Sequence, residues 1–257
     1  MPCGSNQTHR TPLGQYVALS ALVLVLGALA METTSADLTV ADMLYKKSGN
    51  SWALRDLWWT KELLHDGGQT LVKAGAIVAG SIWLASLLTL AVRPFARTCA
   101  YLFLVIVLSA FLSSVGKKYS NVACPWDLER YGSDKRYVTL FAARPVGTPQ
   151  GRCFPGGHSS GGFALLALYF VARARRWRYP GAWLALGAGV GITFALTQWL
   201  RGAHFPSHDV WTAAICWALS WAIFRYVFAS NLLGNVDSSP TEQEYPIERK
   251  FTQSTDL

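Results

Sequence analysis

Six apolar runs divide the chain, and they constrain its fold more than any other feature. They cover residues 16–31, 74–92, 99–115, 159–172, 182–199 and 210–229. A transmembrane helix needs about 20 predominantly apolar residues, and most of these runs approach that length, although the fourth is short. We therefore expect an all-α fold, a bundle of six transmembrane helices.

The composition agrees with a membrane protein. Hydrophobic residues make up 51% of the 257 residues and charged residues only 15%, whereas soluble domains carry about 25% charged residues. The net charge of +8 could indicate nucleic-acid binding. Many basic residues, however, lie in short turns between apolar runs, where membrane topology explains them, so we expect no nucleic-acid partner.

Two basic turns set the expected orientation. Arg93 and Arg97 follow the second run, and arginines at positions 173, 175, 176 and 178 follow the fourth. By the positive-inside rule, these turns and both termini lie in the cytoplasm. Three segments then lie on the outer side of the membrane: residues 32–70, 116–157 and 200–207.

The first run has two interpretations. Ala28-Leu29-Ala30 resembles a signal-peptide cleavage site. The residues before the run contain only Arg10 and a Pro-Leu-Gly break, which is a poor start for a signal peptide. We therefore favour a retained span, which approaches the required length when it is counted from Leu13.

The chain divides into three expected parts. Residues 1–70 hold the first span and an outer segment, of which residues 52–64 mix tryptophan with charged side chains. That mixture predicts a helix in the membrane interface, and the alternative is a loop with a packed aromatic cluster. Residues 71–229 form the membrane core, and residues 230–257 form a polar, disordered tail.

A glycine-rich stretch before the fourth run can bind an anion. Gly156 and Gly157 permit a tight turn, Ser159 or Ser160 can cap the following helix, and the helix N-terminus attracts negative charge. His158, beside that site, could donate a proton to a leaving group. The alternative is an ordinary turn with a structural histidine.

The cysteines argue against a metal site. The chain has five, and none forms a CxxC pair, so we expect no metal. Cys124 and Cys153 share the second outer segment. If the outside is an oxidising compartment, we expect them to form a disulfide, the alternative being two free thiols.

Three clusters on the outer side together resemble a known family. Lys117 is followed, after six residues, by Cys124-Pro125; the second cluster is Pro155-Gly156-Gly157-His158, and the third lies around His204. Their order and spacing are similar to the motifs K-x6-R-P, P-S-G-H and S-R-x5-H-x3-D of the type 2 phosphatidic acid phosphatase (PAP2) superfamily. The resemblance covers roughly residues 70–228 and indicates a divergent bacterial-type subfamily.

The resemblance implies a function and a role for each motif residue. It implies a phosphatase of the bacterial inner membrane, acting without a cofactor on a lipid phosphate or diphosphate at a site facing the periplasm. His204 would attack phosphorus and form a phosphohistidine, and His158 would be the general acid and base. The remaining roles are phosphate binding, by Lys117, Arg201, Gly156 and Gly157, and orientation of His204, by either Asp209 or His208.

The sequence departs from the family pattern at two arginines. Cys124 stands at one of these positions, where Arg144 or Arg152 could compensate, and Gln198 stands at the other. Arg201 lies one helical turn after Gln198, on the same face if this stretch is helical. These departures keep open one alternative, an inactive lipid-binding or transport protein with the same fold. A second alternative is a lipid phosphotransferase, because the same motifs serve hydrolysis and phosphoryl transfer to another lipid.

A different enzyme class is also conceivable. Residues 157–161 fit G-x-S-x-G, the nucleophile elbow of serine hydrolases, with Ser159 as the nucleophile. That elbow requires a preceding β-strand, whereas a loop rich in glycine and proline precedes it here.

The orientation can be tested by cysteine labelling in intact cells. Arg176→Cys, in a basic turn, should be protected from a membrane-impermeant maleimide, and Glu129→Cys, in an outer segment, should react. Labelling of the basic turn from outside would contradict the topology.

Overall fold

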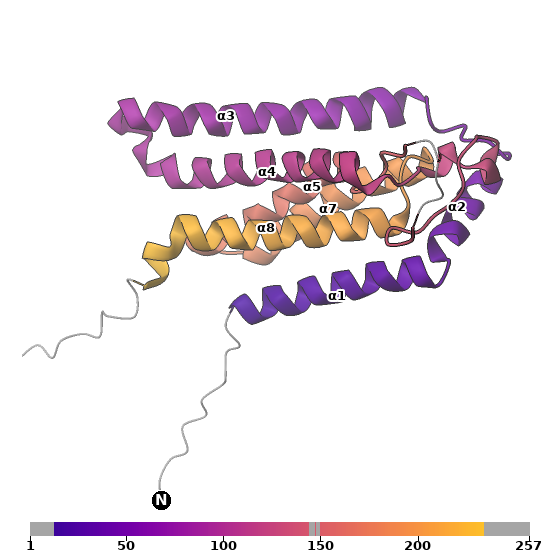
Figure 1. The fold of residues 1–257 in the computed structure, drawn as a ribbon. Coiled ribbons are helices and arrows are strands. Elements are labelled where there is room, and N and C mark those ends of the chain that lie inside the picture. Colours follow the sequence, from indigo (N-terminus) through magenta and orange to yellow (C-terminus); the bar gives the residue numbers. More distant parts are fainter. Residues whose placement is uncertain (1–12, 144–146, 148–149, 234–257) are drawn as a thin grey trace, which may run out of the picture.

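A computed structural model describes residues 13–143, 147 and 150–233 as an all-α bundle (Figure 1). The α-helices are α1 (Leu13–Thr33), α2 (Ala36–Lys47), α3 (Gly68–Leu88), α4 (Ala96–Ser120), α5 (Gly157–Phe163), α6 (Ala167–Ala174), α7 (Pro180–Leu200) and α8 (Pro206–Leu233). Short helices of other types are η1 (Trp59–Gly67), η2 (Leu90–Phe95), η3 (Pro125–Asp127), η4 (Glu129–Tyr131) and η5 (Ala164–Leu166).

Five helices are long and apolar enough to span a membrane within the described part of the chain. They are Leu13–Thr33, Trp59–Leu88, Leu90–Asp127, Pro180–Leu200 and Pro206–Phe228. They correspond to the first, second, third, fifth and sixth predicted spans. The all-α bundle expected from the apolar runs is therefore observed, in an integral membrane protein.

The fourth predicted span is not one continuous helix. It consists of three consecutive helices, α5, η5 and α6. This segment lies in the centre of the bundle, packed against α4, α7 and α8 (Figure 1). Phe170 and Val171 of α6 are almost completely buried. Gly162 lies so close to α7 that a Cβ there would be 2.7 Å from the Cα of Gly191. The segment is apolar because it fills the protein core, not because it faces lipid.

The bundle places the two basic turns at one end. Arg175, after α6, donates hydrogen bonds to the carbonyl of Pro94 and the hydroxyl of Thr98, both near the start of α4. The first described residue of α1 and the last turn of α8 lie at the same end (Figure 1). The loops that carry the three motif clusters gather at the opposite end.

The outer segment before α3 differs from the predicted interfacial helix. Residues 52–57 form turns, and helical structure begins only near Trp58, with η1 running directly into α3. Thr60 fixes this start, because its hydroxyl donates to the carbonyls of Leu54 at 2.5 Å and Leu57 at 3.0 Å. The prediction of one helix over residues 52–64 was therefore wrong for residues 52–57, which are not helical.

Helix α2 was not expected from the sequence, and it fixes the start of α8. Asp37 accepts a hydrogen bond from the amide of Ser207 at 2.9 Å and another from its hydroxyl at 2.5 Å. Free amides at a helix start need such acceptors, which a residue from the same segment usually supplies. Here the acceptor comes from α2, so the N-terminal helices help to place the first turn of α8. As the sequence predicted, that turn begins at Pro206.

The predicted boundary of the C-terminal tail shifts slightly. Helix α8 continues to Leu233, past the expected end of the sixth span at residue 229. Residues 234–257, which make up most of the predicted tail, lie outside the described part of the chain.

Asp37→Ala should destabilise the protein by about 1–3 kcal/mol, because it removes the acceptor for the start of α8 and leaves buried Ser207 donors without a partner. Thermal unfolding in detergent measures this effect. Asp134→Ala, at an exposed side chain, is the control and should change little. Equal stability of the two variants would contradict the role of Asp37.

Candidate active site

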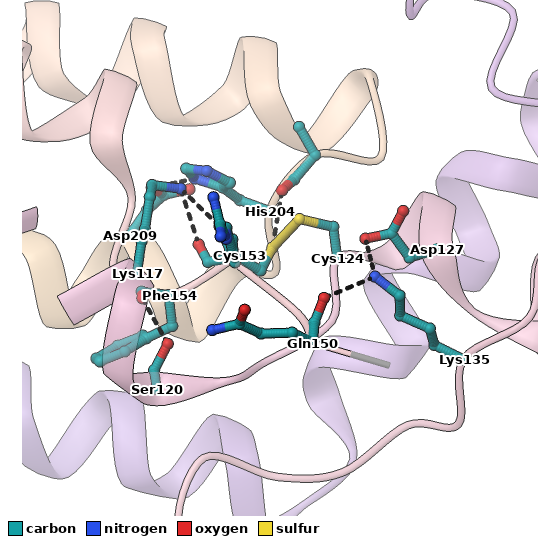
Figure 2. The surroundings of a disulfide bond; sticks show 12 residues. Lys117, Ser120, Cys124, Asp127, Lys135, Gln150, Cys153, Phe154, His204 and Asp209 are labelled. Atoms are coloured by element: carbon teal, nitrogen blue, oxygen red, sulfur yellow. Dashed lines mark hydrogen bonds and ion pairs between the residues drawn. A yellow bond between two sulfur atoms is a disulfide. The ribbon is translucent and has the colours of Figure 1, made fainter. Parts of the chain in front are cut away.

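The three predicted clusters meet at the end of the bundle opposite the basic turns. Lys117 comes from the last turn of α4, His158 from the first turn of α5, His204 from the turn between α7 and α8, and Asp209 from the first turn of α8. Figure 2 shows Lys117, His204 and Asp209 grouped beside the disulfide that joins Cys124 and Cys153.

His204 and Asp209 form a buried pair. The Nδ1 atom of His204 lies 3.1 Å from Oδ1 of Asp209, and their side chains are 6% and 1% exposed. An ionised carboxylate only accepts hydrogen bonds, so the proton of the ring sits on Nδ1 and the Nε2 atom carries a lone pair. Burial lowers the pKa of His204, although Asp209 opposes this effect. The imidazole is therefore neutral, with an unprotonated Nε2 atom, and a ring in this state can act as a nucleophile.

The carboxylate of Asp209 has two further donors. The Ser159 hydroxyl donates to Oδ1 at 2.5 Å, and the indole N–H of Trp199 donates to Oδ2 at 2.6 Å. A buried carboxylate is costly unless several donors satisfy it. These contacts fix the direction in which Asp209 holds His204, and sequence reasoning assigned neither residue to this task.

His208 makes no hydrogen bond to His204 within the described structure, and its Nδ1 atom has no partner there. The two ring centroids are 6.4 Å apart, and the His208 ring packs edge-on against Phe154 and Phe205, each at 5.5 Å. Of the two candidates for orienting His204, Asp209 is the one in hydrogen-bond contact.

His158 is enclosed between two rings. The centroid of Phe194 lies 4.2 Å away and that of His65 lies 4.6 Å away, both in stacked geometry. His158 is only 5% exposed, and neither ring nitrogen has a hydrogen-bond partner within the described structure. Burial, followed by the neighbouring His65, lowers the pKa of His158 to about 3, and the backbone of Leu64 partly opposes this effect. The ring is therefore neutral here, and a bound ligand can pair with it.

His65 was not anticipated as a site residue. It belongs to η1, and its Nδ1 atom lies 2.8 Å from Oδ1 of Asp66. In the sequence, His65 and Asp66 simply end a segment of tryptophans and charges. Only the packing of η1 against α5 brings the two imidazoles together, and no local pattern encodes that contact.

Lys117 is held against the glycine-rich loop. Its Nζ atom donates to the carbonyls of Arg152 at 3.2 Å and Cys153 at 3.3 Å. The disulfide partner of Cys153 is Cys124, with 5.0 Å between the two Cα atoms. The expected covalent link thus ties the loop that receives Lys117 to the segment following α4.

Gly156 lies directly against the His204–Asp209 pair. A Cβ atom at this position would be only 2.2 Å from both Oδ1 of Asp209 and the Ser159 hydroxyl, and 3.0 Å from Nδ1 of His204. The amide of Gly156 donates to the hydroxyl of Thr212 at 2.8 Å. Glycine is therefore required here, and its amide is already paired in this conformation.

The predicted serine cap of α5 is wrong. The residue before the helix is Gly156, and no side chain caps it. The Ser159 hydroxyl turns to Asp209 instead, and the Ser160 hydroxyl donates to the carbonyl of Gly157 at 2.8 Å. The acceptor strength of Asp209 explains the first choice, since hydrogen bonds to charged groups are the stronger ones.

Arg201 lies next to Gln198, as their helical spacing predicted. Its Nη1 atom is 3.5 Å from the Oε1 atom of Gln198, and its Nε atom donates to the carbonyl of Arg55 at 2.8 Å. Of the other two arginines considered as replacements, Arg152 has an exposed side chain and Arg144 lies outside the described residues.

A cavity of about 450 Å³ opens from this site between α3, α4 and α5. Polar groups line one part of it: Gln69, Lys73, Ser113, Ser114, Lys117, His158 and Ser160. Its other walls are mainly apolar: Val72, Ala76, Ile106, Val107, Ala110 and Phe194. The cavity therefore suits an amphiphile whose polar end reaches His158.

Comparison with known proteins gives one match. The family model of the PAP2 superfamily matches residues 98–232, which is more than half of the chain. This range includes Lys117, His158, His204 and Asp209, and it leaves out α1, α2, η1 and α3. No curated protein and no solved structure matches the chain.

Gly156→Ala should destabilise the protein by about 1–3 kcal/mol, because the added methyl group collides with Asp209 and Ser159. Gly156→Ser should do the same, even though the family motif has serine at this position. Gly189→Ala is the control, since a Cβ atom there meets nothing within 4 Å. Thermal unfolding in detergent compares them, and an unchanged Gly156→Ala variant would contradict the packing described.

Proposed function

Because the chain belongs to the PAP2 superfamily, we propose that this membrane phosphatase hydrolyses a lipid phosphate or diphosphate through a phosphohistidine on His204. The observation that carries the proposal is the buried pair of His204 and Asp209, which fixes one ring nitrogen and leaves Nε2 as a nucleophile. Lys117 and His158 are the other groups that the chemistry needs.

In the first step, Nε2 of His204 attacks phosphorus, and the bond between phosphorus and the leaving oxygen breaks. His158 takes up a proton when the anionic phosphate binds beside it, and it then donates this proton to that oxygen. Asp209 remains ionised and balances the positive charge that develops on the His204 ring. Lys117 and Arg201 neutralise the phosphoryl oxygens, where charge must be stabilised during transfer.

In the second step, His158 is neutral and accepts a proton from water. The water oxygen attacks phosphorus, the bond to Nε2 breaks, and inorganic phosphate leaves. This sequence restores neutral His204 and protonated His158, so the catalyst completes a cycle.

The cavity supports a lipid substrate. Its apolar walls come from α3 and α4, two helices of the kind that span membranes, and its polar end contains Lys117 and His158. A hydrocarbon chain could occupy the apolar part while its phosphate reaches His204. The bacterial inner membrane, with the site facing the periplasm, remains our proposed location, and a Cys124–Cys153 disulfide fits an oxidising compartment.

Specific contacts weigh against two of the alternatives. An inactive binding protein has no need of a buried nucleophile held by a carboxylate with two further donors. The serine hydrolase interpretation fails, because Ser159 lies within α5, follows a loop instead of a strand, and donates its hydrogen bond to Asp209. A phosphotransferase would use the same first step, with an acceptor hydroxyl in place of water.

His204→Ala should abolish phosphate release from lipid phosphates, because it removes the nucleophile. Asp209→Ala should slow turnover by roughly 10²–10⁴, the range typical of a lost acid–base contribution. His208→Ala should slow it by less, since this ring makes no hydrogen bond to His204 and lies only beside it. Asp134→Ala, at an exposed side chain, should retain wild-type turnover. Full activity of His204→Ala would overturn the assignment.

His158→Ala should accumulate phosphohistidine on His204 when the substrate has a good leaving group. Such a leaving group needs no proton in the first step, whereas activation of water in the second step is lost. Alkaline quenching followed by peptide mass spectrometry locates the phosphoryl group. Finding it on His208 instead would reject His204 as the nucleophile.

A further inference from the structure

Lys73 faces the same cavity as the proposed catalytic groups. Gln69, Val72, Lys73 and Ala76 line the cavity, and their spacing places them on one face of α3. Large exposed apolar side chains occupy the opposite face of the same helix, at Leu71 and Val78. Lys73 is therefore on the cavity side of α3.

The side chain of Lys73 extends toward the catalytic end of the helix. Its Nζ atom donates to Oε1 of Gln69, one turn earlier, at 3.3 Å. A lysine near a membrane surface often extends in this way to reach water, which explains its direction. It does not explain why this lysine, although exposed, is one of the residues that line the cavity of Lys117 and His158.

The charges around the cavity call for an anion. Two lysines line it, and its described lining contains no carboxylate. Lys73 takes part in none of the ion pairs found within the described structure. A ligand with more than one negative charge could therefore interact with both lysines.

The order of groups along the cavity indicates how such a ligand would lie. Lys117 is at the catalytic end of α4, Ser113 lies one turn away from it, and Ala110 and Ile106 lie successively farther. On α3, Gln69 and Lys73 likewise precede Ala76. The polar groups of Lys73 and Gln69 thus stand between the apolar walls and the catalytic residues.

We propose that Lys73 and Gln69 form a second phosphoryl subsite, and that the preferred substrate is a lipid diphosphate. The inference rests on the proposed phosphatase function. The hydrocarbon chain would occupy the apolar part, the phosphate attached to it would meet Lys73, and the terminal phosphate would reach His204.

The chemistry of diphosphate cleavage gives Lys73 a purpose. Nε2 of His204 attacks the terminal phosphorus, and the bond from that phosphorus to the bridging oxygen breaks. The bridging oxygen keeps the electron pair, develops negative charge as the bond breaks, and then receives the proton of His158, so the lipid leaves as a monophosphate. The Lys73 ammonium would stabilise that charge as it develops. A lipid monophosphate has no phosphoryl group at this position and would gain little from Lys73.

Lys73→Gln tests the subsite in the full-length protein. Phosphate release is measured with two lipids that share one hydrocarbon chain and differ in carrying a monophosphate or a diphosphate. Because a hydrogen bond to a charged group is worth about 1.5–3 kcal/mol, kcat/KM for the diphosphate should fall roughly ten- to hundredfold. For the monophosphate, kcat/KM should change less than about threefold. That ratio corresponds to less than half of the free energy expected for the diphosphate.

Two further variants serve as controls. Lys118 is next to Lys117 in the chain but does not line the cavity. Lys118→Gln should therefore leave kcat/KM unchanged for both substrates. Lys73→Arg keeps the charge and should restore most of the diphosphate activity. An equal loss for both lipids, no loss for either, or a wild-type preference for the monophosphate would overturn the subsite.

Failure of the phosphatase function would look different. If wild-type protein released phosphate from neither lipid, that function would be contradicted, and the subsite would be judged by binding alone. A lipid methylene-diphosphonate, which cannot be hydrolysed at the bridge, should then bind Lys73→Gln at least tenfold more weakly than wild type, as expected for a lost charge-assisted contact. Equal binding would reject the subsite as well.

Discussion

The arrangement of the site depends on the hydrogen bonds that the buried carboxylate of Asp209 accepts. It receives hydrogen bonds from His204, Ser159 and Trp199, which come from the turn before α8, from α5 and from α7. A carboxylate buried to this extent is tolerated only while such donors remain in place. The same interactions that satisfy its charge therefore hold three segments in fixed positions around His204.

The N-terminal region contributes to this site, although the family match does not include it. Asp37 of α2 supplies the acceptor for the start of α8, and the indole N–H of Trp211 donates to Glu32 of α1 at 3.1 Å. From η1, His65 covers one face of His158. These contacts cross the boundary at residue 70 that composition predicts, so the first part of the chain and the membrane core share one site.

Sequence patterns predicted the membrane bundle from the lengths of the apolar runs. They also predicted that the three clusters gather at one end, because successive loops between spans lie on alternate sides of the membrane. They also placed Pro206 at the start of α8 and Arg201 beside Gln198. They could not choose between Asp209 and His208, since both stand in the first turn of α8 and only packing turns one toward His204. Helix α2 and the roles of His65, Ser159 and Trp199 depend on contacts between distant segments, which local periodicity does not encode.

The central position of α5, η5 and α6 has a consequence for how the protein is made. This segment is enclosed by other helices, so its glycines and its histidine never have to tolerate hydrocarbon in the finished fold. During synthesis those helices are not yet all assembled, and a short segment with polar residues partitions poorly into a bilayer on its own. We therefore expect its stable insertion to depend on α7, the helix against which α5 and α6 pack most extensively.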